Sequence, residues 1–563
     1  MDGENLPAKP WWREIQIVWL VVLVVGIYFS RTDDLYLAGE ETRRAQVAAE
    51  MLWSGDWLVP RQQGKIYLSR PPLGSWAIAI VAQLRGELDV VSVRLPTLLA
   101  VLATTLLLYG YTRNFLPREG AFLAAVGYPT MAQVLQLGRV AESEGLFTFF
   151  ISVSLLVWHW GYLKKWPGWA MWSAGYCLAG LAGLTKGPQG IAYFVGPVWF
   201  YLLVIERNWR SLLSPAHLVG LLGGGITIGV WQVPYMMATS WEAGKAVWLT
   251  QASNRFQFFD WAGAVKHFVR FPFEILACTF PWSLAFVQVF NRKCWRALGD
   301  LRSELQFLLV ALAVTFPTVW FAPYARGRYF MPLYPLISIW CGIILSRCAS
   351  ASRETGMNKG WRVFLGGLST AAVVGGIVVC VIAFHPSWVL ENVQIPPIPA
   401  ALFLGLATAI AIWTVSHIGS SEGRSIQVST VCIALIMGFI HTGLIVSSQA
   451  ARQPQVGDLL ADVRTELRPD ETLVSFGRVS HAFAYYYGKF IPQYDWPATA
   501  QDETLPTYFC VRRSDLETHE LPFAWEPIAE MSFEDDDTPS ARTYVVVGRR
   551  LPLIAQKPKP ERN

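Results

Sequence analysis

The sequence places carboxylates and guanidinium groups together in one polar stretch that lies between two apolar segments. Glu40 and Glu41 stand side by side, Arg43 follows two residues later, and Arg70 lies further along the same stretch. A carboxylate can act as a general base, and an arginine can bind a phosphate through two parallel hydrogen bonds. Two acids in the first turn of a helix also interact well with the helix dipole, so a helix cap is the structural alternative.

Further candidate residues, most of them cations, lie in four other polar segments between apolar stretches. These segments contain Arg139, Glu142 and Glu144; Lys186; Arg255, His267 and Arg270; and Arg326, Arg328 and Tyr329. A single cation of this kind can be an interface anchor whose charged end reaches toward water. Four such segments on one side of a membrane together predict a cationic cavity with a few acids, which would suit the anionic head group of a lipid.

The elements that must position these residues are predicted to be membrane helices. The chain of 563 residues is 53% hydrophobic and only 15% charged, whereas soluble proteins carry about 25% charged residues. Disordered, collagen-like and coiled-coil classes are excluded. A spanning helix needs roughly 20 mainly apolar residues, which predicts about thirteen spans, at residues 15–30, 95–112, 119–136, 146–163, 169–183, 188–205, 216–238, 272–291, 305–322, 329–346, 361–384, 397–416 and 427–448.

The loops between these spans predict an orientation. When the N-terminus is placed in the cytoplasm, every second loop is basic, as in Lys164-Lys165 and in the loop with Arg207 and Arg210. Cytoplasmic loops carry such an excess of Lys and Arg, and long loops escape the rule. The long first outer loop, residues 31–94, is rich in arginine against this bias. An odd number of spans sends the C-terminal segment to the outer side of the cytoplasmic membrane.

The chain is predicted to divide near residue 450. The first 450 residues carry a net charge of +10 and the rest carries −5. Residues 451–563 predict a small soluble α/β domain, with a helical stretch at 456–467 and strands at 472–476, 508–512 and 543–547. Residues 1–450 form the predicted transmembrane domain. The acidic run Glu534–Asp537 is interpreted as a solvated turn, and the scattered cysteines, without a CxxC motif, predict neither disulfides nor a cysteine metal site.

Three sub-motifs of the first loop resemble those of a known group of enzymes. They are similar to the first periplasmic loop of the lipid A aminoarabinose transferases and their protein O-mannosyltransferase relatives, glycosyltransferase families 39 and 83 with the GT-C fold. The resemblance covers residues 10–345. Its sub-motifs are Glu40-Glu41-Thr42-Arg43-Arg44-Ala45, Ser54-Gly55-Asp56-Trp57-Leu58-Val59-Pro60 and Ser69-Arg70-Pro71-Pro72, followed by the weaker landmarks Val93-Arg94-Leu95-Pro96, Leu184-Thr185-Lys186-Gly187-Pro188, Pro281-Trp282 and Arg328-Tyr329-Phe330-Met331-Pro332.

The resemblance implies a fold and roles for individual residues. The fold is an α-helical polytopic membrane protein of GT-C type with a small α/β C-terminal domain, and residues 31–94 form its first, catalytic outer loop. The implied acids are Glu40, as base or substrate-orienting group, its neighbour Glu41, and Glu144. The groups implied to hold the phosphate of a polyprenyl-phosphate sugar donor are Arg43, Arg70, Lys186 and Arg270, with Tyr329 nearby.

This sequence departs from the family pattern at three places. The family usually has Asp where Glu40 and Glu144 stand, and its Glu-Lys-Pro is Ser69-Arg70-Pro71 here. A longer acid displaces its carboxylate, and a displacement of about 1 Å can lower a rate about a hundredfold. The missing acid before Arg70 removes an expected metal ligand, which leaves His267 as a lone candidate. We therefore expect no required cofactor, with a bound divalent metal as the alternative.

The function predicted from these observations is glycosyl transfer, with inversion, from a polyprenyl-phosphate sugar to a lipid, glycan or protein acceptor on the outer face of the inner membrane. Membrane lipids are expected partners, and nucleic acid is not. The sequence contains no Gly-rich nucleotide loop. The alternative is a transporter or flippase of lipid-linked glycans, although transporters often show two repeated halves and no repeat is visible here. A noncatalytic scaffold is the third interpretation.

Overall fold

The computed structural model describes residues 11–253, 261–290, 301–323, 325–350, 358–385, 395–417, 423–453, 460, 463, 465–467, 471–499, 505–534 and 542–552. The contacts within the chain define two compact units. The first comprises Met1–Leu35, Ser69–Leu73 and Arg94–Arg452, and the second comprises Tyr36–Leu68, Gly74–Val93 and Gln453–Asn563. The first outer loop thus shares a unit with the C-terminal sheet, a grouping that the predicted domain boundaries did not contain.

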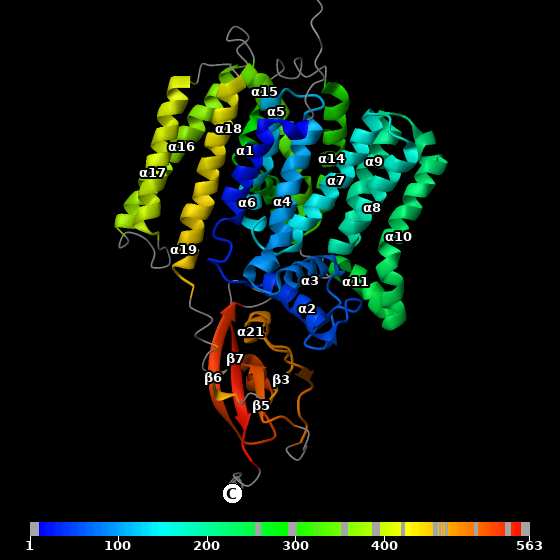
Figure 1. The fold of residues 1–563 in the computed structure, drawn as a ribbon, viewed down its shortest axis with the longest axis vertical. Helices are drawn as coiled ribbons and strands as arrows, with labels where there is room; N and C mark the ends of the chain where they lie inside the picture. The colour runs from blue at the N-terminus through cyan, green and yellow to red at the C-terminus, as the bar shows by residue number, and fades with distance from the viewer. Residues whose placement is uncertain are drawn as a thin grey trace, which may run out of the picture. The chain divides into compact units, whose positions relative to one another are not determined.

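The first unit is helical (Figure 1). Among the described residues, 8 candidate spans are long and apolar enough to cross a membrane. The helices in these spans are α4 (Val90–Thr112), α7 (Ser143–Leu163), α10 (Pro215–Ala238), α14 (Arg302–Trp320), α15 (Tyr334–Ser350), α16 (Asn358–Phe384), α17 (Pro397–His417) and α18 (Gly423–Gly438), which continues through η11 (Phe439–Ile445) into α19 (Val446–Ala450).

Further helices complete the first unit. They are α1 (Ile15–Val24), extended by the π-helical η2 (Val25–Phe29); α5 (Arg118–Gly127), η3 (Tyr128–Thr130) and α6 (Ala132–Leu137); α8 (Gly168–Lys186) and α9 (Gln189–Phe200), with η4 (Tyr201–Ile205) and η5 (Trp209–Leu213); α11 (Trp241–Ser253), α12 (Trp261–Cys278) and η6 (Trp282–Phe290); η8 (Gly327–Leu333); and η1 (Trp11–Arg13). The predicted spans 119–136 and 272–291 are therefore interrupted helices. The total of about thirteen spans stays a prediction.

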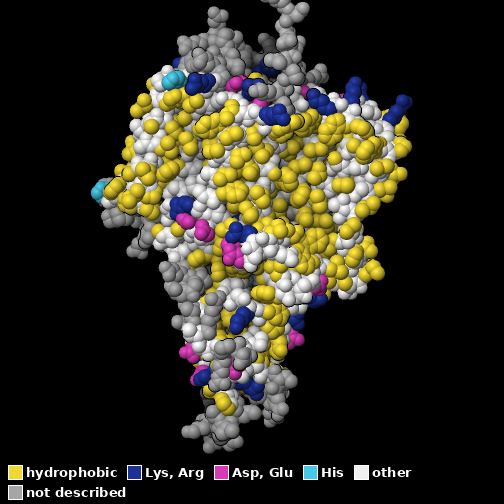
Figure 2. Space-filling view, viewed as in Figure 1, with side chains coloured by type: hydrophobic (Ala, Val, Ile, Leu, Met, Phe, Trp, Pro, Cys, Tyr) yellow, Lys and Arg dark blue, Asp and Glu magenta, His cyan; other side chains and the backbone are white. Residues whose placement is uncertain are grey.

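The surface of these helices is apolar, as expected of a chain surrounded by lipid. Hydrophobic side chains cover most of the helical part that faces the viewer in Figure 2. On α10, Val230 is 71% exposed and Met237 is 83% exposed. Soluble monomers rarely expose contiguous apolar patches of this kind. Together with the spans, this surface confirms the prediction of a polytopic α-helical membrane protein.

Small residues allow the central helices to approach closely, as is usual between membrane helices. The hydroxyl of Ser338 on α15 donates to the carbonyl of Ala124 on α5 over 2.6 Å. A Cβ built on Gly342 would lie 2.4 Å from the Cβ of Ala124. Any side chain at Gly342 would therefore push α15 away from α5, so glycine is required there.

The second unit combines the first outer loop with a five-stranded sheet. Its helices are α2 (Glu40–Ser54), most of α3 (Leu73–Arg85), α21 (His481–Tyr487) and α22 (Arg513–Thr518), and a short hairpin joins β1 (Arg61–Gln62) to β2 (Lys65–Ile66). The sheet has the order β4-β3-β5-β7-β6, formed by β3 (Leu473–Phe476), β4 (Gln493–Tyr494), β5 (Tyr508–Arg512), β6 (Trp525–Glu534) and β7 (Arg542–Arg550).

The sheet is mixed. Strand β3 pairs in parallel with β4 and β5, and β7 pairs antiparallel with β5 and β6. Alternate residues of β5 face two separate apolar cores, with Cys510 in one and Phe509 in the other. The predicted small α/β C-terminal region and its three strands are thereby confirmed. Asp535–Asp537 lie outside the described residues.

Candidate active site

The centre of the candidate site is an ion pair between α7 and α8 in the first unit. The ammonium of Lys186 donates to Oε1 of Glu144 over 2.8 Å. Their side chains are only 1% and 3% exposed. Charged groups are buried to this extent only when they are paired, because an isolated buried charge is very costly. The structure thus brings together one predicted acid and one predicted phosphate-binding cation.

Helix termini place both members of this pair. Glu144 lies in the first turn of α7, where the helix dipole favours negative charge, and Lys186 is the last residue of α8, where it favours positive charge. Gly187 ends α8 with φ +94°, a conformation that residues with a Cβ rarely adopt. The chain therefore turns directly after Lys186, and the ammonium stays at the helix end.

A second ion pair extends the cluster through η8. The guanidinium of Arg328 contacts Oε2 of Glu142 at 2.6 Å, and its Nε lies 3.9 Å from Oε1 of Glu144. The ammonium of Lys186 lies 5.2 Å from the centre of the Tyr329 ring, and Cζ of Arg328 lies 5.8 Å from the same centre. Cations at such distances over an aromatic ring are stabilised by its π electrons. Tyr329 thus lies beside Lys186, and its predicted place near the donor phosphate stays a prediction.

Arg70 completes this charge cluster. Its guanidinium interacts electrostatically with both Glu144 and Lys186. The five charged members, Glu142, Glu144, Arg70, Lys186 and Arg328, have three positive and two negative charges. We call them the ion cluster. Its three cations, Arg70, Lys186 and Arg328, favour binding of an anion such as a phosphodiester.

Arg328 and Glu142 were predicted from the sequence only as members of the cationic cavity, without roles of their own. The sequence feature that could have identified Arg328 as a site residue is its position directly before Tyr329. Arg270, by contrast, is exposed on α12, and Arg255 lies outside the described residues. The predicted role of Arg270 at the donor phosphate stays a prediction.

Glu40 and Glu41 open α2 in the second unit and differ in accessibility. Gly39, with φ +53°, directly precedes the helix. The carboxylate of Glu40 accepts from Nη1 of Arg43 at 2.8 Å and lies 3.5 Å from Nη2 of Arg44, and its side chain is 24% exposed. Glu41 is only 4% exposed. Of the two neighbouring acids, Glu40 is therefore the one that a substrate can reach.

Arg43 also forms part of a buried hydrogen-bond network on α2 and α21. Its Nε donates to Nε2 of His481 over 2.9 Å, and Gln62 and Arg478 contact the same imidazole. Burial, together with the charges of Arg43, Arg478 and Arg512, holds the pKa of His481 well below its usual range. The imidazole is therefore neutral and can accept the hydrogen bond. No signal in the sequence pointed to this histidine, because 438 residues separate it from Arg43.

Glu50 anchors the hairpin of the first loop. Its carboxylate accepts from the backbone N–H of Gln63 over 2.5 Å and of Gly64 over 3.0 Å. Burial raises the pKa of Glu50 even though these hydrogen bonds and nearby Arg61 lower it. This buried acid, which was not among the residues predicted from the sequence, has a structural role: it holds the turn of the β1–β2 hairpin against α2.

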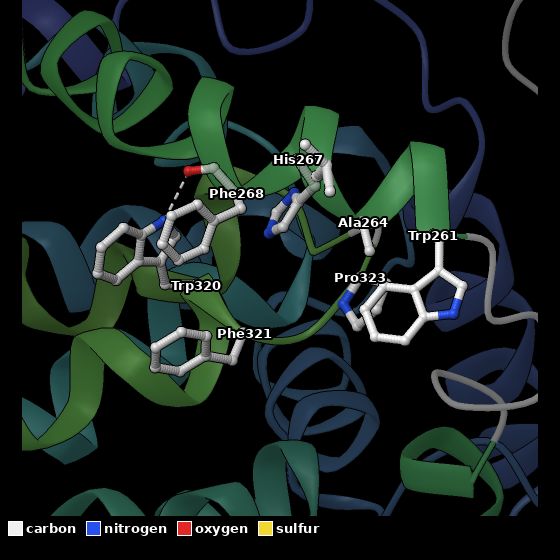
Figure 3. Close-up of a pocket in the computed structure, with 8 residues that line it drawn as sticks. Trp261, Ala264, His267, Phe268, Trp320, Phe321 and Pro323 are labelled. Atoms are coloured by element: carbon white, nitrogen blue, oxygen red, sulfur yellow. Dashed lines mark hydrogen bonds between the residues drawn. The ribbon is translucent and has the colours of Figure 1, made fainter.

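His267 lies in a mainly aromatic pocket. Figure 3 shows it on α12 among the rings of Trp261, Phe268, Trp320 and Phe321. These residues line a cavity of about 260 Å³. Its Nε2 lies 3.3 Å from the carbonyl of Val319. Within the part of the chain that the structure describes, no group of three or more His, Cys, Asp or Glu side chains could hold a metal ion. The described residues that line this pocket include none of the carboxylates that a divalent ion such as Mg²⁺ or Ca²⁺ usually prefers.

Comparison with known proteins identifies the class of this fold. Residues 69–231 match the family model of dolichyl-phosphate-mannose-protein mannosyltransferases. The structure is similar to that of ArnT from Cupriavidus metallidurans bound to undecaprenyl phosphate, with a TM-score of 0.66 and 18% sequence identity over 94% of this chain and 97% of that one. The chain therefore has the GT-C fold. The expected resemblance to the group of aminoarabinose transferases and protein mannosyltransferases is confirmed.

Sequence relatives point to the same group. The chain is 26% identical over 328 residues to the undecaprenyl phosphate-alpha-4-amino-4-deoxy-L-arabinose arabinosyl transferase of Pseudomonas aeruginosa, covering 53% of each chain. It is 27% identical to an uncharacterised protein of Aquifex aeolicus, over 58% of this chain and 63% of that one. The chain thus spans about half to two thirds of the length of these relatives.

Proposed function

We propose that this chain is an integral-membrane glycosyltransferase that uses a polyprenyl-phosphate sugar as donor. The observation that carries the proposal is the ion cluster, in which Lys186 is buried and Arg328 half-buried beside Glu144, and Arg70 interacts with both members of the buried pair. A sugar phosphodiester carries one negative charge, which these three cations can bind. The relatives agree with this donor, since undecaprenyl phosphate is bound in the ArnT structure and appears in the name of the Pseudomonas enzyme.

The ion cluster favours departure of the phosphate. When the bond between the anomeric carbon and the phosphate oxygen breaks, its electron pair stays on the phosphate, which changes from a diester to a monoester and gains negative charge. Cations already fixed in a buried place stabilise this new charge without reorganising. Arg70, Lys186 and Arg328 supply these cations, and Glu142 and Glu144 hold two of them in position.

The acceptor hydroxyl attacks the anomeric carbon from the face opposite the phosphate, so the configuration inverts. Its proton passes to a carboxylate. Glu40 suits this role better than Glu144, because the carboxylate of Glu144 is held by Lys186 and almost fully buried, whereas Glu40 is 24% exposed. Glu41 lies next to Glu40 and supports the local negative charge. Arg43 keeps Glu40 oriented through their 2.8 Å contact and contributes to donor binding.

The remaining properties follow from this proposal. The protein lies in the inner membrane with its N-terminus in the cytoplasm and its C-terminal segment on the periplasmic side. The donor sugar is a hexose or a pentose, and the acceptor is a lipid, a glycan or a protein. Catalysis needs no cofactor, and membrane lipids surround the chain.

A donor panel tests the proposal directly. Membranes containing the chain are incubated with a set of radiolabelled polyprenyl-phosphate sugars, and transfer of label to an acceptor is measured. We expect consumption of at least one donor, loss of transfer in Lys186→Met, and normal transfer in the control Lys245→Met, which removes a half-exposed lysine on α11. Movement of lipid-linked glycan across vesicles without donor consumption would instead identify a transporter.

A further inference from the structure

The first unit contains a second cationic cavity that the proposed transfer reaction does not use. It has a volume of about 460 Å³ and is lined by Arg31, Arg94, Arg139 and His441 together with Gln136 and Gln449. None of these residues belongs to the ion cluster. A water molecule occupies roughly 30 Å³ of liquid, so the cavity has room for a group much larger than one water.

The three arginines give this cavity a strong positive charge. Asp34, which accepts from Nε of Arg31 over 2.6 Å, is the acid paired with them. Burial and the nearby charges of Arg94 and Arg31 lower the pKa of Arg139 to about 10, so its guanidinium remains charged at neutral pH. Arg31 and Arg139 alone carry two positive charges against the single negative charge of Asp34, which favours an anion in this cavity.

Part of this charge already has a structural use. Arg139 donates to the carbonyls of Ile27 and Ser30, and Arg94 donates to those of Thr32 and Leu35. These bonds end the first helix and would exist without a ligand. Arg31, however, uses only Nε and Nη1, toward Asp34, the carbonyl of Thr442 and the hydroxyl of Ser447. Its Nη2 has no partner among the described residues.

His441 provides the second, independent observation. It is 8% exposed and lines the cavity, and its Nδ1 has no hydrogen-bond partner among the described residues. A buried polar atom without a partner costs free energy unless a ligand or water satisfies it. The residue lies in η11, a π-helical segment inside the last candidate span, and such segments often occur at functional sites.

The position of the cavity indicates the source of the anion. Arg31 follows the end of η2, and Gln449 lies in α19 near the end of the last candidate span, so the cationic groups stand where membrane helices end. Lipid head groups lie at this level, and the apolar chains lie below it. The wall continues into Val446 and Ile445, and Ile445 is 43% exposed. Gln136 and Gln449 are exposed at the rim, so the cavity opens outward.

We infer that this cavity binds the phosphate of an anionic membrane lipid, held by Arg31, Arg139 and His441 while its acyl chains lie along the apolar wall at Ile445 and Val446. The residues that line this cavity include no member of the ion cluster. It would couple the protein to the charged lipids around it, and it exists whether or not the proposed transfer reaction is correct.

Lipid retention by the full-length protein tests the inference. The protein in detergent is mixed with phosphatidylglycerol or with phosphatidylcholine, and bound lipid is counted by native mass spectrometry. We expect retention of phosphatidylglycerol over phosphatidylcholine. Arg31→Met and His441→Leu should each weaken this retention about tenfold or more, because each removes a contact to a charged group. The unfolding temperature of each variant is measured as well, to check that the variant is folded.

Two controls make the result specific. Arg452→Met removes an exposed arginine near the same end of the last helix that does not line the cavity, and Arg210→Met removes an exposed arginine of η5, so both variants should retain the lipid normally. Equal retention by wild type, Arg31→Met and His441→Leu would overturn the inference. Displacement by millimolar inorganic phosphate, with no preference between the two lipids, would show a site for free anions and would also overturn it.

Discussion

Lys186 and Glu144 face each other across α8 and α7 with 2.8 Å between Nζ and Oε1, and both side chains are almost completely buried. Arg328 lies 3.9 Å from the same carboxylate oxygen. A carboxylate held in this way has little freedom to accept a proton from a substrate. Glu144 is therefore better suited to fix the cations that meet the donor phosphate, and several consequences can be measured.

Removing one partner of this buried pair should destabilise the protein. Glu144→Gln leaves Lys186 without its counter-charge, and breaking a buried pair costs about 3–5 kcal/mol. We expect a lower unfolding temperature and a loss of sugar transfer. The double variant Glu144→Gln/Lys186→Met should recover much of the stability but none of the transfer. If the double variant were as unstable as the single one, the ion pair would not be the cause.

Glu40→Gln should separate chemistry from folding. The change removes the charge at nearly constant shape and should lower turnover by about a hundredfold or more. Donor binding and stability should stay near normal, because the amide oxygen of glutamine can still accept the hydrogen bond from Nη1 of Arg43. Glu87→Gln, an exposed acid of the same unit, is the matched control. Unchanged turnover in Glu40→Gln would assign the base elsewhere.

Arg70 should contribute to donor binding through its forked guanidinium. Arg70→Ala should weaken donor use by about 1.5–3 kcal/mol, measured as a change in kcat/KM for the donor. Arg70→Lys should restore only part of this loss, since lysine lacks the bidentate fork. Full activity of Arg70→Lys would mean that charge alone matters at this position.

His481 should make stability dependent on pH. Its pKa is depressed in the folded protein, so the unfolded chain binds the proton more readily. The imidazole therefore favours folding above a pH of about 6.5, and stability should fall by about 1.4 kcal/mol per pH unit below that value, until the folded-state pKa is reached. Thermal unfolding between pH 7 and pH 5 measures this slope. His481→Gln should reduce it, whereas the exposed His519→Gln should leave it unchanged.

Chelation tests the expectation of a reaction without a metal. Treatment of the wild type with EDTA should leave sugar transfer largely intact, because carboxylates and fixed cations perform the chemistry. Loss of transfer with recovery on addition of a divalent ion would contradict this expectation. His267→Ala would then show whether that histidine is a ligand.

The sequence alone determined the class of the protein and the order of its parts. A membrane requires long apolar runs whose backbone groups are satisfied internally, so the runs near residues 146–163 and 361–384 could be read directly as the helices α7 and α16. A short apolar run with two aromatic residues, Tyr508-Phe509-Cys510-Val511, likewise indicated the strand at 508–512. The first-loop motif with Glu40 and Arg70 indicated the group of enzymes, because its spacing lies within one continuous segment.

The tertiary structure decided which charges meet. Glu144 and Lys186 are 42 residues apart, and Arg43 and His481 are 438 residues apart. Such pairs depend on how helices and strands pack, and hydropathy and local spacing carry no information about that packing. The same reason explains the break between α5 and α6, since an interrupted helix and a continuous one have nearly the same apolar composition. Sequence therefore supplied the candidate groups, and packing selected the partners that hold them.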